Sequence, residues 1–160
     1  MGAERAGVPE LGLEVLDILW SCYVLRHHSL ESQDELDAMR RLKIQQVLTN
    51  DVLLRLAKLG EANRGSWNFA QAAKRAKRGD TPRLAEQIKQ YRELIQSIAQ
   101  VRNSRIAHRA KQSQAGSPPP LEMWSAVGMA VSLLDELSGE RVAYHVGGID
   151  LRNAVLGEAA

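Results

Sequence analysis

The 160-residue chain has few cysteines, few aromatic residues and no long apolar run. Its one cysteine, Cys22, cannot form an internal disulfide bond, so a reducing cytoplasm is the expected compartment. Cys22 lies in the apolar segment ILWSCYVL, which favours a buried, inert thiol over a nucleophile. Trp20, Trp67 and Trp124 each lie among apolar helical residues, a setting that favours core or dimer-interface packing over base stacking.

Signals for export or membrane insertion are also missing. Glu4 and Arg5 are followed by no apolar run of the signal-peptide kind, and Ala6 breaks the pattern for myristoylation. The longest largely apolar run, 124–134, is much shorter than the roughly 20 residues that span a bilayer. We therefore expect a soluble, cytoplasmic protein with no membrane partner.

Patterns for metal ions and phosphate loops are absent from the sequence. His145 has no Cys or His neighbour at zinc-ligand spacing, and the adjacent His27 and His28 would diverge by about 100° on a helix. Gly147 and Gly148 lack the spacing of a phosphate-binding loop and are typical of a turn. We expect no metal site and no cofactor.

Positive charge, by contrast, is concentrated in one region. The net charge is only +2, yet residues 74–111 hold eleven Lys and Arg against three Asp and Glu, whereas residues 112–160 hold two against six. A local excess of this kind attracts phosphates, although the exposed surface of an ordinary helix can be equally charged. Both interpretations stay open at this point.

Apolar residues recur at spacings of three and four along most of the chain, which predicts helices. In the second predicted helix the apolar pattern consists of Leu36, Met39, Leu42, Ile44, Val47, Leu48, Val52, Leu53, Leu56 and Leu59. Thr81 and Pro82 form a helix start signal, and QAGSPPP is a stop. The segment LTND is the expected place for a break or bend in the long second helix. The predicted helices span about 9–28, from 32 or 34 to 65, a short stretch capped by Ser66, 81–112, and 121–137.

The tail after residue 137 is expected to be irregular or extended, closing with one turn of helix. The sequence therefore predicts a single all-α domain over 1–160, a bundle of four to five main helices with a short irregular C-terminal tail.

The fourth predicted helix carries an unusual cluster in QVRNSRIAHRAK, residues 100–111. At about 100° per residue, an apolar stripe occupies a sector about 120° wide, and the cluster continues in that sector or at its edge. The stripe consists of Tyr91, Leu94, Ile95, Ile98 and Val101, and it is followed by Arg102, Arg105, His108 and Arg109.

Three arginines without partners cannot enter a core, because burying a bare charge costs at least several kcal/mol. They require an acidic partner, a water-filled cleft or a phosphate. Alternatively, the helix end projects beyond the bundle, where the arginines complement the negative helix C-terminus.

The segment RNSRIAH resembles the R-(four to six residues)-H signature of the HEPN superfamily, the higher eukaryotes and prokaryotes nucleotide-binding domains. Arg102 is followed by the polar Asn103, and five residues separate Arg102 from His108. The segments DVLLRLAKLGEANRGSWNFAQAAK, VRNSRIAHRAK and LLDELSGERVAYHVGGIDLRNAV are similar to blocks of the abortive-infection U-type branch. The resemblance covers about 34–155.

The resemblance implies a HEPN-like helical bundle that pairs as a homodimer and brings two motifs to one cleft. It further implies a metal-independent endoribonuclease of phage defence or a toxin–antitoxin pair. His108 would be the general base or acid, since its pKa permits both protonation states near neutrality. Arg102 would bind the scissile phosphate. Asn103 would orient the motif or the partner subunit.

Other cationic residues near the motif are expected to bind further phosphates of the RNA. Arg105, Arg109 and Lys111 are candidate phosphate contacts, and Ala110 departs from the tyrosine or aspartate that related proteins often carry there. The expected partners are RNA, a second copy, and an antitoxin or defence protein. The alternative function is a non-catalytic HEPN-like module for RNA or anion binding or for dimerisation.

Overall fold

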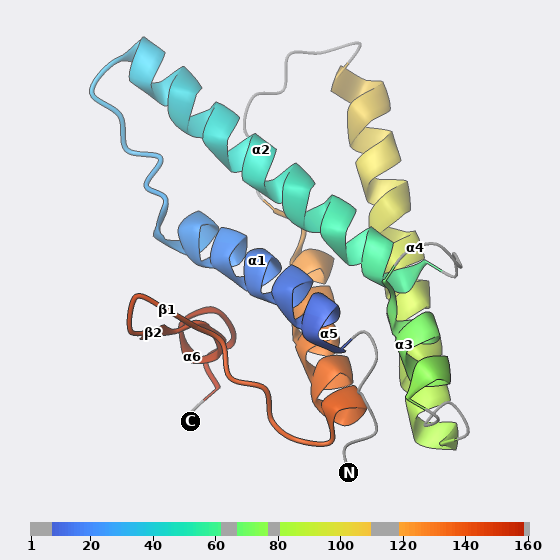
Figure 1. Cartoon of the computed structure of the whole chain (residues 1–160). Helices are drawn as coiled ribbons and strands as arrows, with labels where there is room; N and C mark the ends of the chain where they lie inside the picture. Colours follow the sequence, from blue (N-terminus) through green and yellow to red (C-terminus); the bar gives the residue numbers. More distant parts are fainter. Residues whose placement is uncertain (1–7, 62–66, 77–80, 110–118, 159–160) are drawn as a thin grey trace.

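The computed structural model describes residues 8–61, 67–76, 81–109 and 119–158, and of 101–109 it describes the backbone and the exposure of Asn103. This part of the chain is helical apart from one small hairpin, so the predicted all-α fold class is confirmed (Figure 1). The elements are α1 (Val8–His27), α2 (Glu35–Gly60), α3 (Phe69–Arg75), α4 (Pro82–Arg109), α5 (Leu121–Ser138), β1 (His145–Val146), β2 (Ile149–Asp150) and α6 (Leu151–Leu156).

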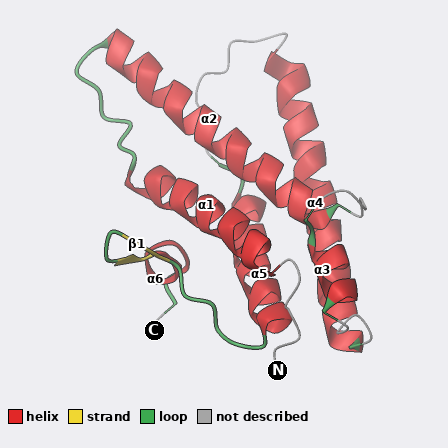
Figure 2. Ribbon diagram, viewed as in Figure 1, coloured by secondary structure: helices red, strands yellow, loops and turns green. Residues whose placement is uncertain are grey.

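The helices pack around a single cluster of buried apolar side chains. Helix α1 contacts α2, α5 and α6, while α4 contacts α2, α3 and α5 (Figure 2). All six helices contribute to the cluster, which removes their apolar stripes from water. Fully or nearly fully buried members from each helix are Leu11, Leu56, Phe69, Tyr91, Leu134 and Leu151.

Side-chain caps start the helices α2, α3 and α6. The carboxylate of Asp34 accepts a hydrogen bond of 2.8 Å from the backbone N–H of Asp37, which satisfies an otherwise free donor in the first turn of α2. Helix α3 is capped by Asn68, whose side-chain oxygen accepts from the N–H of Gln71 at 2.9 Å. The prediction of Ser66 as this cap was wrong; Ser66 itself lies outside the described residues.

Helix α2 is shorter at its end and more regular than the sequence predicted. It ends at Gly60 rather than at Gly65, because the backbone is already extended at Glu61. The LTND segment causes no interruption, since the helix continues from Glu35 to Gly60 without a break. Thr49 of that segment is buried, so tertiary packing outweighs its low helix propensity.

Ion pairs fix α2 against α1. Nη1 of Arg55 lies 2.9 Å from Oε2 of Glu14, and Nζ of Lys58 lies 2.8 Å from Oε1 of the same carboxylate. Burial alone would raise the pKa of Glu14, but hydrogen bonds from Lys58 and Arg55 hold it below its ordinary value. These contacts set which side of α2 is turned away from the bundle.

The tail forms a hairpin followed by α6, in line with the predicted extended arm and closing turn. Val146 pairs with Ile149, and Gly147 and Gly148 connect the strands with φ of 55° and 80°. Two successive positive φ values suit the two-residue turn of a hairpin, so the predicted turn is confirmed.

Arg152 holds this tail on α5. Its guanidinium donates from Nη1 to Oδ2 of Asp135 at 2.8 Å and from Nη2 to Oε2 of Glu158 at 2.6 Å. It also donates to the carbonyl of Val142 at 3.1 Å. The side chain is only 7% exposed, so its charge is stable there because carboxylates surround it.

None of the helices in the described part of the chain is both long and apolar enough to cross a membrane.

Candidate functional site

Helix α4 carries the motif, and its first two thirds have the inward face that the sequence predicted. Tyr91, Ile95 and Ile98 are buried and Leu94 is partly buried. The apolar stripe therefore packs against the core as expected. Val101, the last predicted member of the stripe, has a side chain outside the described part.

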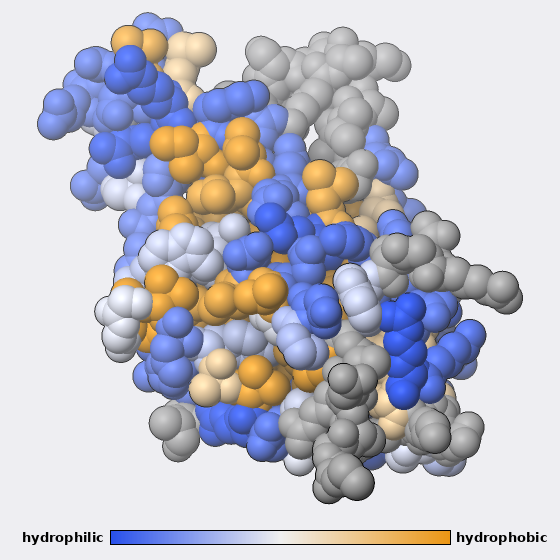
Figure 3. Space-filling model, in the orientation of Figure 1, coloured by the Kyte–Doolittle hydropathy of each residue, from blue (hydrophilic) through white to orange (hydrophobic). Residues whose placement is uncertain are grey.

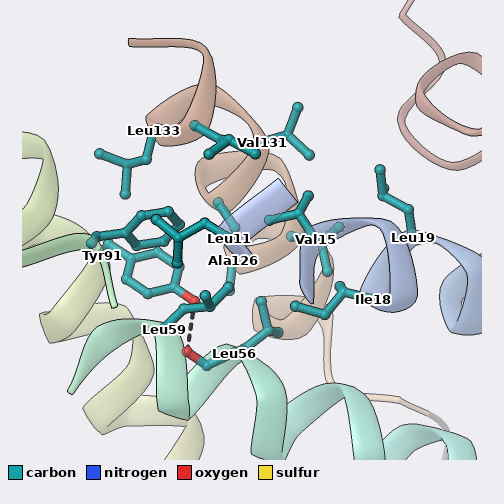
Figure 4. Close-up of a cluster of buried hydrophobic side chains, with 14 of the residues drawn as sticks. Leu11, Val15, Ile18, Leu19, Leu56, Leu59, Tyr91, Ala126, Val131 and Leu133 are labelled. Carbon is teal, nitrogen blue, oxygen red and sulfur yellow. Dashed lines mark hydrogen bonds between the residues drawn. The ribbon is translucent and has the colours of Figure 1, made fainter. Parts of the chain in front are cut away.

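Tyr91 is the anchor of α4 on α2. Its hydroxyl donates a hydrogen bond of 2.7 Å to the carbonyl of Leu56, and Figure 4 shows this bond among the buried side chains. The ring of Phe69 meets the Tyr91 ring edge-on with centroids 5.2 Å apart. Burial raises the pKa of Tyr91 well above its ordinary value, so the hydroxyl stays protonated and keeps donating.

The backbone of α4 is helical through Arg109, so Arg102 and His108 belong to one helix. Asn103 is exposed, in agreement with its predicted place opposite the apolar stripe. The side chains of Arg102, Arg105, His108 and Arg109 lie outside the described part, and Lys111 lies outside the described residues altogether. The roles assigned to these five residues stay predictions.

Helices α2 and α4 pack together near the C-terminal end of α2 and diverge from there. Figure 1 shows the C-terminal end of α4 standing away from the N-terminal half of α2. The contact region includes Gly60, where an added Cβ would lie 3.2 Å from Cε1 of Tyr91. The motif-bearing turns of α4 therefore lie beyond the part of this helix that packs near the end of α2.

A groove that sequence analysis did not predict runs between the first half of α4 and α5. One part of about 510 Å³ is lined by Arg83, Gln87, Ser132, Asp135, Glu136, Gly139 and Glu140. Nη2 of Arg83 forms an ion pair of 2.9 Å with Oε1 of Glu136. Three carboxylates against one guanidinium give this part an acidic lining, which does not suit a phosphate backbone.

The side-chain oxygen of Gln87 is buried in this groove with no hydrogen-bond partner in the described structure. Gln87 also lines an adjoining hollow of about 390 Å³ beside Ser125, Gly128 and Ser132 of α5. The sequence signal for this groove is the series of small residues Ser125, Gly128 and Ser132 along α5. Such a series is equally typical of close helix packing, so it does not predict a groove.

Cys22 is buried in the core, and the described histidines either contact backbone carbonyl groups or lie exposed. The Cys22 thiol is fully buried, and desolvation raises its pKa to about 12, which confirms the predicted inert thiol. His27 lies exposed near the end of α1, with Nδ1 2.8 Å from the carbonyl of Tyr23. His28 places Nε2 2.9 Å from the carbonyl of Arg41, and His145 is exposed on β1. The prediction that His27 and His28 are helix-end residues is confirmed.

The tryptophans take two kinds of surroundings. Trp124 is partly buried under the guanidinium of Arg26, 4.6 Å from its ring centroid, and Arg75 covers Trp67 at 4.5 Å. Trp20 is 40% exposed on α1 and stacks on Tyr23 with centroids 5.5 Å apart. Packing explains Trp67 and Trp124, whereas Trp20 keeps much of its ring at the surface.

A second feature that the sequence did not reveal is the outer face of α2. Five large apolar side chains of this helix point away from the core: Leu36, Met39, Ile44, Val47 and Leu54. The predicted second helix included the first four as part of one apolar pattern. The structure separates them from the inward residues Val52, Leu53, Leu56 and Leu59.

Within residues 8–61, 67–76, 81–109 and 119–158, no three His, Cys, Asp or Glu side chains gather in a way that could hold a metal ion. Compared with known proteins, the chain matches no family model, no curated protein and no solved structure.

Proposed function

We propose that this chain is a metal-independent endoribonuclease of the HEPN type that acts as a homodimer in phage defence or as a toxin. One observation carries the proposal: α4 continues as an unbroken helix to Arg109, so Arg102 and His108 are six residues apart on a single helix. In the sequence, this is the spacing and setting by which RNSRIAH resembles the HEPN signature.

The burial of α4 supports the helical phase on which the proposal depends. Tyr91, Ile95 and Ile98 face the core, and Asn103 is exposed. An ideal helix continued in this phase assigns Arg102 to the sector of the buried stripe and His108 to its edge. The motif follows Ile98, the last described member of the stripe, and the proposal requires that its charged groups meet RNA there.

The chemistry requires a proton acceptor, a proton donor and a positive charge near one phosphate. The ribose 2′-oxygen bonds to phosphorus, the bond from phosphorus to the 5′-oxygen breaks, and a 2′,3′-cyclic phosphate and a 5′-hydroxyl result. His108 of the two subunits would accept the 2′-proton and deliver a proton to the 5′-oxygen. Arg102 would stabilise the charge that develops on the phosphate oxygens.

The test is cleavage of mixed RNAs by the purified full-length chain in the presence of EDTA. We expect 2′,3′-cyclic phosphate ends, and a loss of rate of roughly a hundredfold or more for His108→Ala and for Arg102→Ala. Matched controls are His145→Ala on β1 and Arg92→Ala, an exposed arginine of the same helix. Both controls should cleave like the wild type.

Two results would reject the nuclease. A wild type that binds RNA without cleaving it, with binding lost in Arg102→Ala, would establish the non-catalytic module instead. A wild type that neither binds nor cleaves RNA, with both motif variants unfolding more easily than the controls, would assign the motif a structural role.

A further inference from the structure

Charge is unevenly distributed along both α2 and α4. Residues 38–50 of α2 include three Lys and Arg and no Asp or Glu, and residues 99–109 of α4 include three Arg and no acidic residue. The other halves are nearly balanced, with two cations against one acid in 51–60 and three against two in 82–98. Helical segments without acidic residues attract the phosphates of a nucleic acid.

The two cationic halves extend from one helix contact. Gly60 of α2 lies against Tyr91 of α4, where an added Cβ would be 3.2 Å from the ring. From there the N-terminal half of α2 and the C-terminal half of α4 run toward the same end of the molecule (Figure 1). Lys43 lies 17 residues before Gly60, and His108 lies 17 residues after Tyr91. Each is therefore about 26 Å from the contact along its helix, so Lys43 and the motif lie at a similar level.

Lys43 is the cation of α2 that is best placed to bind a phosphate near the motif. Arg40 and Lys43 are exposed, and neither forms an ion pair with another described residue. Arg41, in contrast, is held by Asp37 at 2.9 Å. At about 100° per residue, Arg40 lies roughly 160° around α2 from Gly60, on the side turned away from α4. Lys43 lies roughly 100° from Gly60, on the flank that leads toward α4.

Met39 places an apolar side chain on the same flank. It is 62% exposed, and it lies one helical turn before Lys43, so the two side chains are neighbours on the helix surface. Figure 3 shows apolar patches among hydrophilic surface over α2. Proteins bind single-stranded nucleic acids by combining cations along the backbone with side chains that pack against the bases. The polarizable thioether of methionine packs well against ring systems.

We propose that residues 38–50 of α2 form a second RNA-binding segment beside the motif, in which Lys43 binds a phosphate and Met39 packs against an unpaired base. The inference rests on the proposed function, which supplies RNA as the ligand, and it names the substrate class as single-stranded RNA. A strand that contacts both helices is several nucleotides long. A duplex is a poorer ligand, because its stacked bases are not available to Met39.

The first test is binding of a labelled single-stranded RNA of about 15 nucleotides, measured by fluorescence anisotropy with full-length His108→Ala so that the RNA stays intact. Adding Lys43→Gln should weaken binding roughly three- to tenfold at low salt. It should also make the slope of log K against log salt shallower by about 0.7, the effect of one lost phosphate contact on a single strand. Met39→Ser should weaken binding roughly threefold and leave this slope unchanged, because the lost contact carries no charge.

Lys89→Gln is the matched control for charge. Lys89 is exposed on the first half of α4, before the contact at Tyr91, so this variant should keep both the affinity and the salt slope. Far-ultraviolet circular dichroism and thermal unfolding verify that each variant folds.

A crosslinking experiment tests direct contact. The only native thiol, Cys22, is fully buried, so a thiol-reactive photo-crosslinker labels Lys43→Cys at residue 43 alone. We expect this label to crosslink to the bound RNA, whereas the same label on Lys89→Cys should not.

The segment is rejected if the full chain binds no RNA, or if Lys43→Gln binds with unchanged affinity and salt slope. It is also rejected if the label at residue 43 does not crosslink, or if a duplex of equal length binds as tightly as the single strand. The cleavage assay decides the nuclease separately. A wild type that does not cleave RNA, but whose binding depends on Lys43, would keep the segment and reject the nuclease. Cleavage by the wild type with unchanged binding by Lys43→Gln would do the reverse.

Discussion

At the scale of single residues, burial decides which groups are chemically available. Cys22 is completely enclosed by the core, and loss of water around the thiolate raises its pKa to about 12, although the charge of Arg26 acts in the opposite direction. A thiol in this state is neither a nucleophile nor a redox sensor at neutral pH. The same residue is, however, a reporter of unfolding, because the chain has no other cysteine.

The raised pKa of Cys22 predicts an alkaline loss of stability. Up to the ordinary pKa of 9.0 both states keep the proton, so the thiol's full contribution to stability is present. Above it the unfolded chain releases its proton first, and this contribution falls as pH rises toward about 12. Urea unfolding at stepped pH should show a steeper alkaline decline for the wild type than for Cys22→Ala. Equal slopes would mean that the folded thiol is solvated.

At the scale of elements, the crossing of α2 and α4 depends on a glycine. Gly60 lets the two backbones approach until the ring of Tyr91 occupies the space that a Cβ would take. That ring is held in place, because its hydroxyl donates to the carbonyl of Leu56 and it packs against the Phe69 ring in a T-shaped pair. Gly128 in α5 is the opposite case, since an added Cβ there would meet nothing within 4 Å.

These two glycines predict opposite effects of the same substitution. Gly128→Ala should stabilise the fold by about 0.5–1 kcal/mol, because alanine loses less backbone entropy in a helix. Gly60→Ala should destabilise it by about 1 kcal/mol, since overpacking against Tyr91 outweighs the same helical gain. Urea unfolding midpoints measure both. Gly60→Ala as stable as Gly128→Ala would show that α2 and α4 can shift apart.

At the scale of the whole molecule, one core joins the beginning and the end of the described chain. Leu11 of α1 and Leu151 of α6 belong to the same buried cluster. Arg152 reinforces this connection by pairing with Asp135 of α5 and with Glu158. The tail is therefore part of the fold: the sequence predicted an irregular or extended arm closing with one turn of helix, and the structure packs that closing helix into the core.

The shared core predicts a single unfolding transition. Calorimetric and van't Hoff enthalpies should agree, and circular dichroism and tryptophan fluorescence should change together, because no helix keeps its buried face when the others leave. This outcome would support the prediction of one domain. Two separate transitions, for instance with the tail melting first, would contradict it.

Much of the helical fold was predictable because its signals are local. The cap at Asp34, the start at Pro82 and the glycine turn at 147–148 each depend on the chemistry of a few neighbouring residues. The apolar phase of α4 through Ile98 was predictable for the same reason. The proposed roles of Arg102 and His108 also come from the sequence and stay predictions.

Other features were decided only by packing between distant segments. Asn and Ser are both good helix caps, so residue type alone does not decide between Asn68 and Ser66. Asn68 is the cap because α3 begins at Phe69, whose side chain is buried in the core. Periodicity counted Leu36 and Leu53 alike as apolar helical residues, yet one is exposed and the other buried. The sequence by itself determined where helices form, because their hydrogen bonds and caps are local. Tertiary structure decided which apolar stripe of α2 is covered, because that depends on where α1 and α5 lie.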